Sequence, residues 1–129
     1  MSALATMLHS FYTGVENIFK RAAIEIDGGP PTTENWHRDL LDSMATSTAW
    51  RSAVVSADTQ RRLLGYLSFR HVFRHAYTFR LRWDKMAVLV LECEGVFRQL
   101  EADLNSFLRA GNGAAWEASQ WELLRPAAE

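Results

Sequence analysis

The stretch "MAVLVLECEGVFRQLEADLNSF", Met86–Phe107, decides the fold class of this chain. Its apolar side chains recur at steps of three and four residues, which is the spacing of one face of an α-helix. Asp84 just before it is suited to cap a helix, and Gly111 and Gly113 after it are residues that end one. The stretch therefore predicts a long helix that packs one face on other helices. That face consists of Met86, Leu89, Cys93, Phe97, Leu100, Leu104 and Phe107.

Two further helices are predicted in the N-terminal part of the chain. Apolar residues repeat at helical spacing from about Ser2 to Asp27, and Gly28–Pro31 ends that helix because proline cannot continue the hydrogen-bonded ladder. Thr32 or Thr33 is suited to cap a second helix. The apolar face of the first helix consists of Leu4, Leu8, Phe11, Val15, Ile18 and Ala22, and that of the second of Trp36, Leu40 and Met44.

Residues 45–56 predict a loop with short helical turns, and a third helix follows it. Ser56 is a good N-cap, and Asp58 is favourable in the first turn because its charge complements the helix dipole. The core face of this helix consists of Leu63, Leu64 and Leu67, and the loop contains Trp50, Val54 and Val55.

Together these elements predict one all-α domain, an antiparallel bundle of four to five helices over residues 1–110. A chain of 129 residues is long enough to bury a single core. Residues 111–129 form a separate tail, in which Trp116 and Trp121 fit one short helix that docks back on the bundle. With Trp50, these tryptophans are alternatively a surface that binds a partner.

Composition predicts a soluble cytoplasmic protein. The formal net charge is −1, so no field of the whole molecule attracts nucleic acid or membrane, and any such attraction must be local. The single cysteine, Cys93, excludes an internal disulfide and favours a reducing compartment. Residues 1–10 lack a signal-peptide pattern, and the longest apolar run, Met86–Leu91, is too short to span a bilayer.

Positive charge gathers in one segment, "FRHVFRHAYTFRLRW", Phe69–Trp83. No acid lies between Asp58 and Asp84. Two histidines that titrate near neutral pH, His71 and His75, lie among the charges. The pattern predicts a basic cleft on an otherwise acidic body. The arginines between the two aspartates are Arg61, Arg62, Arg70, Arg74, Arg80 and Arg82.

Three interpretations of this segment are open. In the plainest, the arginines complement the dipole at a helix C-terminus and the histidines are packing or surface residues. A metal site is the second, since His71 and His75 stand four apart on one helical face. No Cys, Asp or Glu nearby completes the coordination, however, and the arginines repel a divalent cation. We therefore expect neither a metal nor a cofactor.

The third interpretation is RNA cleavage by the neighbouring 2′-hydroxyl, which needs no metal. The reaction needs a group that moves protons near neutral pH, which an imidazole supplies, and a fixed cation for the charge of the phosphorane-like transition state. Arginine suits the second role because its planar fork holds two phosphate oxygens. Arg70 and His75 are such a pair. Arg74, Arg80 and Arg82 are candidates to hold the flanking backbone, and Phe73, Tyr77 and Phe79 to stack on bases.

Arg70, His75 and Tyr77 spell R-x4-H-x-Y, and with this motif the chain resembles the HepT-like toxins of the HEPN superfamily. The segments "SFYTGVENIFKRAA" (10–23) and "WHRDLLDSM" (36–44) are also similar, so the resemblance covers most of residues 4–108. It implies a small all-α, metal-independent endoribonuclease. Such an enzyme is a toxin encoded beside a minimal nucleotidyltransferase antitoxin called MntA, and the expected product is a 2′,3′-cyclic phosphate.

Carried onto this sequence, the resemblance implies Arg70 and His75 as the catalytic pair and Tyr77 as the hydroxyl that the antitoxin modifies with AMP. His71 stands where many HepT sequences have asparagine. There it either orients Arg70, shares the proton transfer, or is a helix-packing residue. Two rival functions are a non-catalytic HEPN bundle that serves as the binding subunit of a nucleotidyltransferase, and a helical interaction protein without a site.

The spacing of the motif also bears on assembly. On an unbroken helix, positions 70 and 75 point about 140° apart, whereas positions 70 and 77 differ by only about 20°. One continuous helix therefore cannot aim Arg70 and His75 directly outward at one spot. Either the helix loosens after Arg70, or two copies face each other across a two-fold axis. The resemblance implies a homodimer, and we expect Arg70 and His75 at a solvent-facing helix end.

Five other residues have mainly structural interpretations. Tyr66, Trp36 and Trp83 are expected to pack in the core. His37 is expected to face solvent or to bond locally, and His9 to lie at an edge of the first helix.

Overall fold

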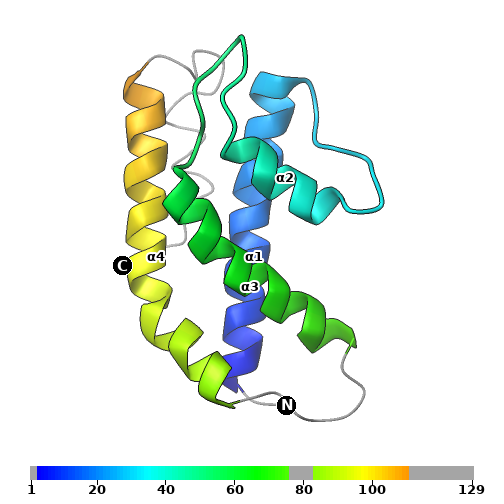
Figure 1. The fold of residues 1–129 in the computed structure, drawn as a ribbon, viewed down its shortest axis with the longest axis vertical. Coiled ribbons are helices and arrows are strands. Elements are labelled where there is room, and N and C mark those ends of the chain that lie inside the picture. The colour runs from blue at the N-terminus through cyan, green and yellow to red at the C-terminus, as the bar shows by residue number, and fades with distance from the viewer. Residues whose placement is uncertain (1–2, 76–82, 111–129) are drawn as a thin grey trace.

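The structure, a computed structural model, describes residues 3–75 and 83–110, with only the backbone for residues 73–75 and 83. Every regular element in these residues is a helix (Figure 1). The prediction of an all-α bundle is therefore confirmed, while the tail, residues 111–129, lies outside the described residues. The elements are α1 (Ala3–Ala22), the π-helical segment η1 (Ala23–Asp27), α2 (Trp36–Met44), α3 (Ala57–His75) and α4 (Trp83–Arg109).

The N-terminal helix α1 is the centre of the bundle. It contacts α2, α3 and α4, and α3 also contacts α2 and α4. In Figure 1, α3 crosses in front of α1 and runs in the opposite direction to both α1 and α4. The short helix α2 lies across the upper half of α1. The ends of α2 and α3 are therefore brought onto the same side of α1, where the candidate site lies.

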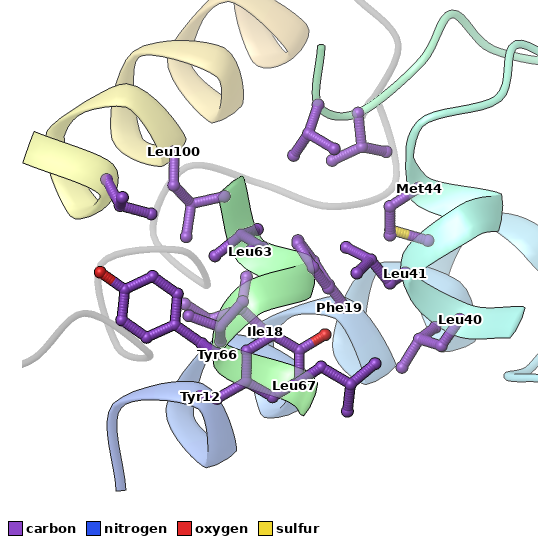
Figure 2. Close-up of a cluster of buried hydrophobic side chains, with 14 of the residues drawn as sticks. Tyr12, Ile18, Phe19, Leu40, Leu41, Met44, Leu63, Tyr66, Leu67 and Leu100 are labelled. Atoms are coloured by element: carbon purple, nitrogen blue, oxygen red, sulfur yellow. The ribbon is translucent and has the colours of Figure 1, made fainter. Parts of the chain in front are cut away.

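The core fills the space between these helices. Figure 2 shows large side chains from all four helices meeting there. Each side chain of this size contributes roughly 1.5–3 kcal/mol when it is fully buried. The largest fully buried side chains are Leu8, Tyr12 and Phe19 of α1, Leu40, Leu41 and Met44 of α2, Leu63 and Tyr66 of α3, Leu100 and Leu104 of α4, and Val54 of the loop.

The helix ends follow most of the predicted signals, but the prediction that Thr32 or Thr33 caps α2 is wrong, because α2 begins at Trp36 and its N-cap is Asn35. The first helical run ends at Gly28, whose φ of 85° is the left-handed conformation that favours glycine. Ser56 caps α3, because its Oγ accepts a hydrogen bond from the Thr59 backbone N–H at 3.1 Å. The prediction for Asp84 is wrong by one position. Helix α4 begins at Trp83, so Asp84 lies in the first turn instead of capping it.

The loop between α2 and α3 is confirmed, and a buried arginine fixes its path. Arg51 donates through Nε and Nη2 to the two carboxylate oxygens of Asp27, at 2.8 and 2.9 Å. It also donates to three main-chain carbonyls, those of Ser43, Thr46 and Ser52. All five guanidinium hydrogens therefore have a partner. We call this arrangement the Arg51 clamp. It was not predicted from the sequence.

The remaining core predictions have mixed outcomes. Tyr66 is buried as predicted, and its hydroxyl donates to the Leu89 carbonyl at 2.7 Å. Trp36 is partly buried against the core and His9 is at its edge. Trp50 is 88 % exposed, and the side chain of Trp83 lies outside the described atoms. No helix in residues 3–75 and 83–110 has the length and apolar character that crossing a membrane requires.

Candidate functional site

The basic segment begins in the second half of α3. That helix continues without a break through Arg70 and His71 to His75. Of the two alternatives, a helix that loosens after Arg70 and two copies that face each other, the first is therefore excluded for residues 70–75. The positions of residues 70 and 75 lie about 140° apart around one helix axis. The side chains of Arg74 and His75, and all of Tyr77, Arg80 and Arg82, lie outside the described atoms, so their predicted roles stay predictions.

Arg70 is buried, which corrects the expectation that it faces solvent. Its side chain is 4 % exposed, and Nη2 lies 2.9 Å from Oε2 of Glu16, itself 6 % exposed. Nη1 donates to Oγ1 of Thr13 at 3.2 Å. The guanidinium also lies over the ring of Tyr12, 5.0 Å from its centroid. The burial is possible because α1 supplies a carboxylate at this point, since an unpaired buried charge is strongly unfavourable.

His37 completes this group of side chains. Its Nδ1 lies 2.7 Å from Oε2 of Glu16 and 3.0 Å from Nη2 of Arg70. The expectation that His37 faces solvent or bonds locally is therefore wrong, because its partners are 21 and 33 residues away in sequence. We call Arg70, Glu16, His37 and Thr13 the Arg70 cluster.

Sequence reasoning missed both Glu16 and His37. The available signal was Glu16, an acid on the apolar face of α1, four residues after Tyr12 and three before Phe19. An acid at such a core position needs a buried partner. The sequence alone does not say which of the many arginines and histidines that partner is.

Nδ1 of His37 lies 2.7 Å from a carboxylate, which can only accept, and 3.0 Å from a guanidinium, which can only donate, so it bonds one of them at a time. The shorter contact is the one to Glu16, and in that arrangement Nδ1 carries the hydrogen. The ring is held in its plane by stacking on Trp36, with ring centroids 3.7 Å apart. Trp36 is itself covered by Lys20, whose Nζ lies 4.5 Å from the centroid of the Trp36 ring. Nε2 is then the ring nitrogen that is able to accept a proton.

The Arg70 cluster borders a hollow of about 610 Å³ between α2 and α3. His37 and Arg38 line it from α2, and Arg70, His71 and Val72 line it from α3. Two arginines and two imidazoles thus border one open space with a single acid, Glu34, and this excess of cationic groups suits an anionic ligand. We call this space the α2–α3 hollow.

The Tyr12 phenol and a second, larger hollow are less suited to a reaction at a phosphate. Burial raises the pKa of the Tyr12 phenol, and the carboxylate of Glu16 raises it further, so this hydroxyl stays protonated at neutral pH. A larger hollow of about 1000 Å³ opens beside the Arg51 clamp. Its two acids, Asp27 and Asp42, and the fully bonded Arg51 leave it no cation to offer a phosphate.

No group of three or more His, Cys, Asp or Glu side chains that could hold a metal occurs among the described residues. The side chain of His75 lies outside them, so the expectation of a metal-free site stays a prediction.

The comparison with known proteins agrees with the fold and the motif. The model of a family described as HepT-like protein matches residues 3–111, which include all four helices and the R-x4-H-x-Y motif. The chain belongs to the HepT-like family. The resemblance read from the sequence is thereby confirmed.

Membership of the HepT-like family carries a general function. It places the chain in the HEPN superfamily of ribonucleases and among the HEPN toxins of toxin–antitoxin systems. Searches of curated proteins and of solved structures returned no significant match to this chain.

Proposed function

We propose that this HepT-like chain is a metal-independent endoribonuclease that cleaves RNA by attack of the 2′-hydroxyl and leaves a 2′,3′-cyclic phosphate. The observation that carries the proposal is the position of Arg70. This motif arginine lines the α2–α3 hollow beside the imidazoles of His37 and His71, and it lies at the start of the basic segment, residues 69–83. Catalytic roles fall to Arg70 and His75, and RNA-binding roles to His71, Arg74, Arg80 and Arg82.

The contacts of Arg70 support a role in the transition state. Glu16 and Thr13 hold the guanidinium in one orientation before a substrate arrives. A cation that is positioned in advance stabilises developing charge without reorganising at the moment of reaction. The planar fork then meets the phosphate oxygens as the phosphorane-like charge develops, while His75 transfers a proton.

A second copy of the chain completes the site in this proposal. Helix α3 is continuous from Arg70 to His75, so one copy does not aim both residues directly at one phosphate. Two copies related by a two-fold axis bring Arg70 of one protomer toward His75 of the other. Val72, which is 53 % exposed on α3, is an apolar side chain at the same helix end that such a contact would cover.

Control by a nucleotidyltransferase antitoxin of the MntA type is the remaining part of the proposal. Tyr77, whose structure lies outside the described residues, is the expected site of AMP attachment. A tethered AMP places a phosphate near the arginines that hold RNA, and it competes at high effective concentration. Tyr77→Phe should therefore stay toxic in cells that express the antitoxin.

The burial of Arg70 favours a second candidate function. Its ion pair with Glu16 is the kind of contact that a structural arginine makes. In a non-catalytic HEPN bundle that serves as the binding subunit of a nucleotidyltransferase, Arg70 would need only to stabilise the fold through this ion pair. A cleavage assay separates the two functions.

The test uses the purified chain, a single-stranded RNA and an excess of EDTA. We expect cleavage with a 2′,3′-cyclic end, and a loss of at least about 100-fold in His75→Ala. Arg98→Ala is the matched control, because Arg98 is an exposed arginine on α4, paired with Glu94, and should leave the rate unchanged. Activity lost on chelation and restored by a divalent metal would contradict the metal-free mechanism. An inactive wild type that binds the nucleotidyltransferase would support the second function.

A further inference from the structure

The Arg70 cluster contains an imidazole that the R-x4-H-x-Y motif does not include. His37 comes from α2, yet its Nδ1 lies 3.0 Å from Nη2 of Arg70. The motif histidine, His75, stands about 140° around α3 from Arg70. Among the side chains that the structure describes, the imidazole in contact with the motif arginine within one protomer is that of His37.

The surroundings of His37 resemble those of a histidine that handles protons. Nδ1 lies closer to the carboxylate of Glu16, at 2.7 Å, than to Nη2 of Arg70, at 3.0 Å, and in the tautomer that donates to Glu16 the lone pair is on Nε2. Nδ1 faces Glu16 and Arg70, whose side chains are 6 % and 4 % exposed, whereas the His37 side chain is 33 % exposed. His37 lines the α2–α3 hollow, in which the proposed function places the phosphate.

We propose that His37 is a second proton-transfer group of this site and acts as the general base, an inference that rests on the proposed ribonuclease function. Nε2 of His37 takes the proton from the 2′-hydroxyl as the bond from O2′ to phosphorus forms. The bond from phosphorus to O5′ breaks, and O5′ takes a proton from the second imidazole, that of His75. Arg70 holds the phosphate between them.

Two imidazoles suit this reaction better than one. The base must be unprotonated and the acid protonated at the same pH, which two separate groups achieve together. The charged and titratable groups around His37 are Glu16 and Lys20 from α1, Glu34 and Arg38 next to it in sequence, and Arg70 and His71 from α3. Of these, Glu16 and Arg70 contact Nδ1 of His37.

The deciding variant is His37→Asn. Its side-chain amide nitrogen occupies the place of Nδ1 and still donates to Glu16, but nothing replaces Nε2. The matched control is His9→Asn, which removes a partly buried imidazole of α1 that does not line this hollow. Both variants are made in the full chain and are checked by thermal unfolding and by binding of a non-cleavable RNA with 2′-deoxy linkage.

We expect His37→Asn to cut RNA at least about 100-fold more slowly at an unchanged Tm and unchanged RNA affinity. Its pH–rate profile should lose the rise that reports deprotonation of a base. His9→Asn should cut RNA at a rate close to that of the wild type and keep the profile. A fully active His37→Asn with the wild-type profile would overturn the role of His37 and leave the ribonuclease function standing.

A second measurement does not depend on activity. Nitrogen-15 NMR of histidine side chains should show His37 as the Nδ1–H tautomer in the wild type and in the His9→Asn protein. An Nε2–H tautomer would overturn the assignment even if His37→Asn were inactive. A wild type that cuts no RNA would overturn both proposals together.

Discussion

Two arginines are buried in the part of the chain that the structure describes, and their surroundings differ in kind. Arg51 gives every one of its five hydrogens to Asp27 or to a main-chain carbonyl, so it holds the loop before α3 against the end of η1. Arg70 is bound instead by side chains, and two of them, Glu16 and His37, are ionisable. The hollow beside the Arg51 clamp is lined by two acids, whereas the hollow beside the Arg70 cluster is lined by two arginines, two imidazoles and one acid.

Under the proposed function, this difference separates a buried ion pair that builds the fold from one that builds a site. Burial and ion pairing are the same in both, so neither property by itself identifies a functional arginine. The partners distinguish them. Main-chain carbonyls hold a backbone in place, whereas an imidazole beside a guanidinium is an arrangement that many active sites use.

Removal of the clamp should have the largest effect on stability. Arg51→Ala leaves Asp27 and three carbonyls without their partner, and breaking a buried pair costs about 3 kcal/mol or more. Urea unfolding followed by circular dichroism measures the loss. The RNA cleavage rate per folded molecule should stay close to that of the wild type. A specific loss of rate in a stable variant would show that the two arginines are not separable in this way.

Replacement of the site arginine should have the opposite signature. Arg70→Lys keeps a positive charge near Glu16 but loses the planar fork, so cleavage should fall about 100-fold while stability changes little. Lysine is the better variant because Arg70→Ala would leave the buried charge of Glu16 unpaired. Cleavage and urea unfolding are measured on the same preparation. A Lys variant with full activity would assign Arg70 to the fold, as for Arg51.

Mixing two inactive variants tests whether Arg70 works with a histidine from another copy. In an equal mixture of Arg70→Lys and His75→Ala, half of the dimers are mixed, and each mixed dimer has one intact composite site. The expected activity is about a quarter of that of the wild type. Subunit exchange is followed by mass spectrometry. Exchange without recovered activity would mean that each protomer holds a complete site.

An exposed arginine is the reference for both buried ones and should show the smallest effect. Arg61 pairs with Asp58 in the first turn of α3, where both side chains are exposed. Arg61→Ala should leave the unfolding midpoint near neutral pH within error of the wild type, because exposed pairs contribute little. A clear decrease of the unfolding midpoint would mean that this exposed ion pair stabilises the fold as the buried ion pairs do.

The Asp58–Arg61 pair also leads to a prediction about how stability depends on pH. Hydrogen bonds from Gln99 and then Arg61 hold the pKa of Asp58 below its ordinary value of 3.8. Its contribution is therefore present above pH 3.8 and is lost as the pH falls through the lowered pKa. Asp58→Asn should flatten that part of the stability curve slightly. An unchanged acid limb would mean that the bond to Gln99 contributes nothing.

The sequence predicted most of the elements because their signals are local. Period-3.6 stripes located all four helices, and the Gly28–Pro31 stop and the Ser56 cap located their ends within a residue or two. The wrong prediction that Asp84 caps α4 also concerns a helix end, and the ends are the part of a helix that local signals determine least. The motif and the family also follow from the sequence, because both are patterns of residue types along the chain.

The tertiary structure alone decided which way Arg70 faces. Its partners come from two other helices and stand 33 to 57 residues away in sequence, so no local spacing connects them. The packing of α3 against α1 places residue 70 over Tyr12 and Glu16, and burial then requires the ion pair. His37 reaches the same point because α2 lies across α1. The sequence by itself determined the helices, the basic segment and the family, while the assembly of the Arg70 cluster depended on how three helices meet in space.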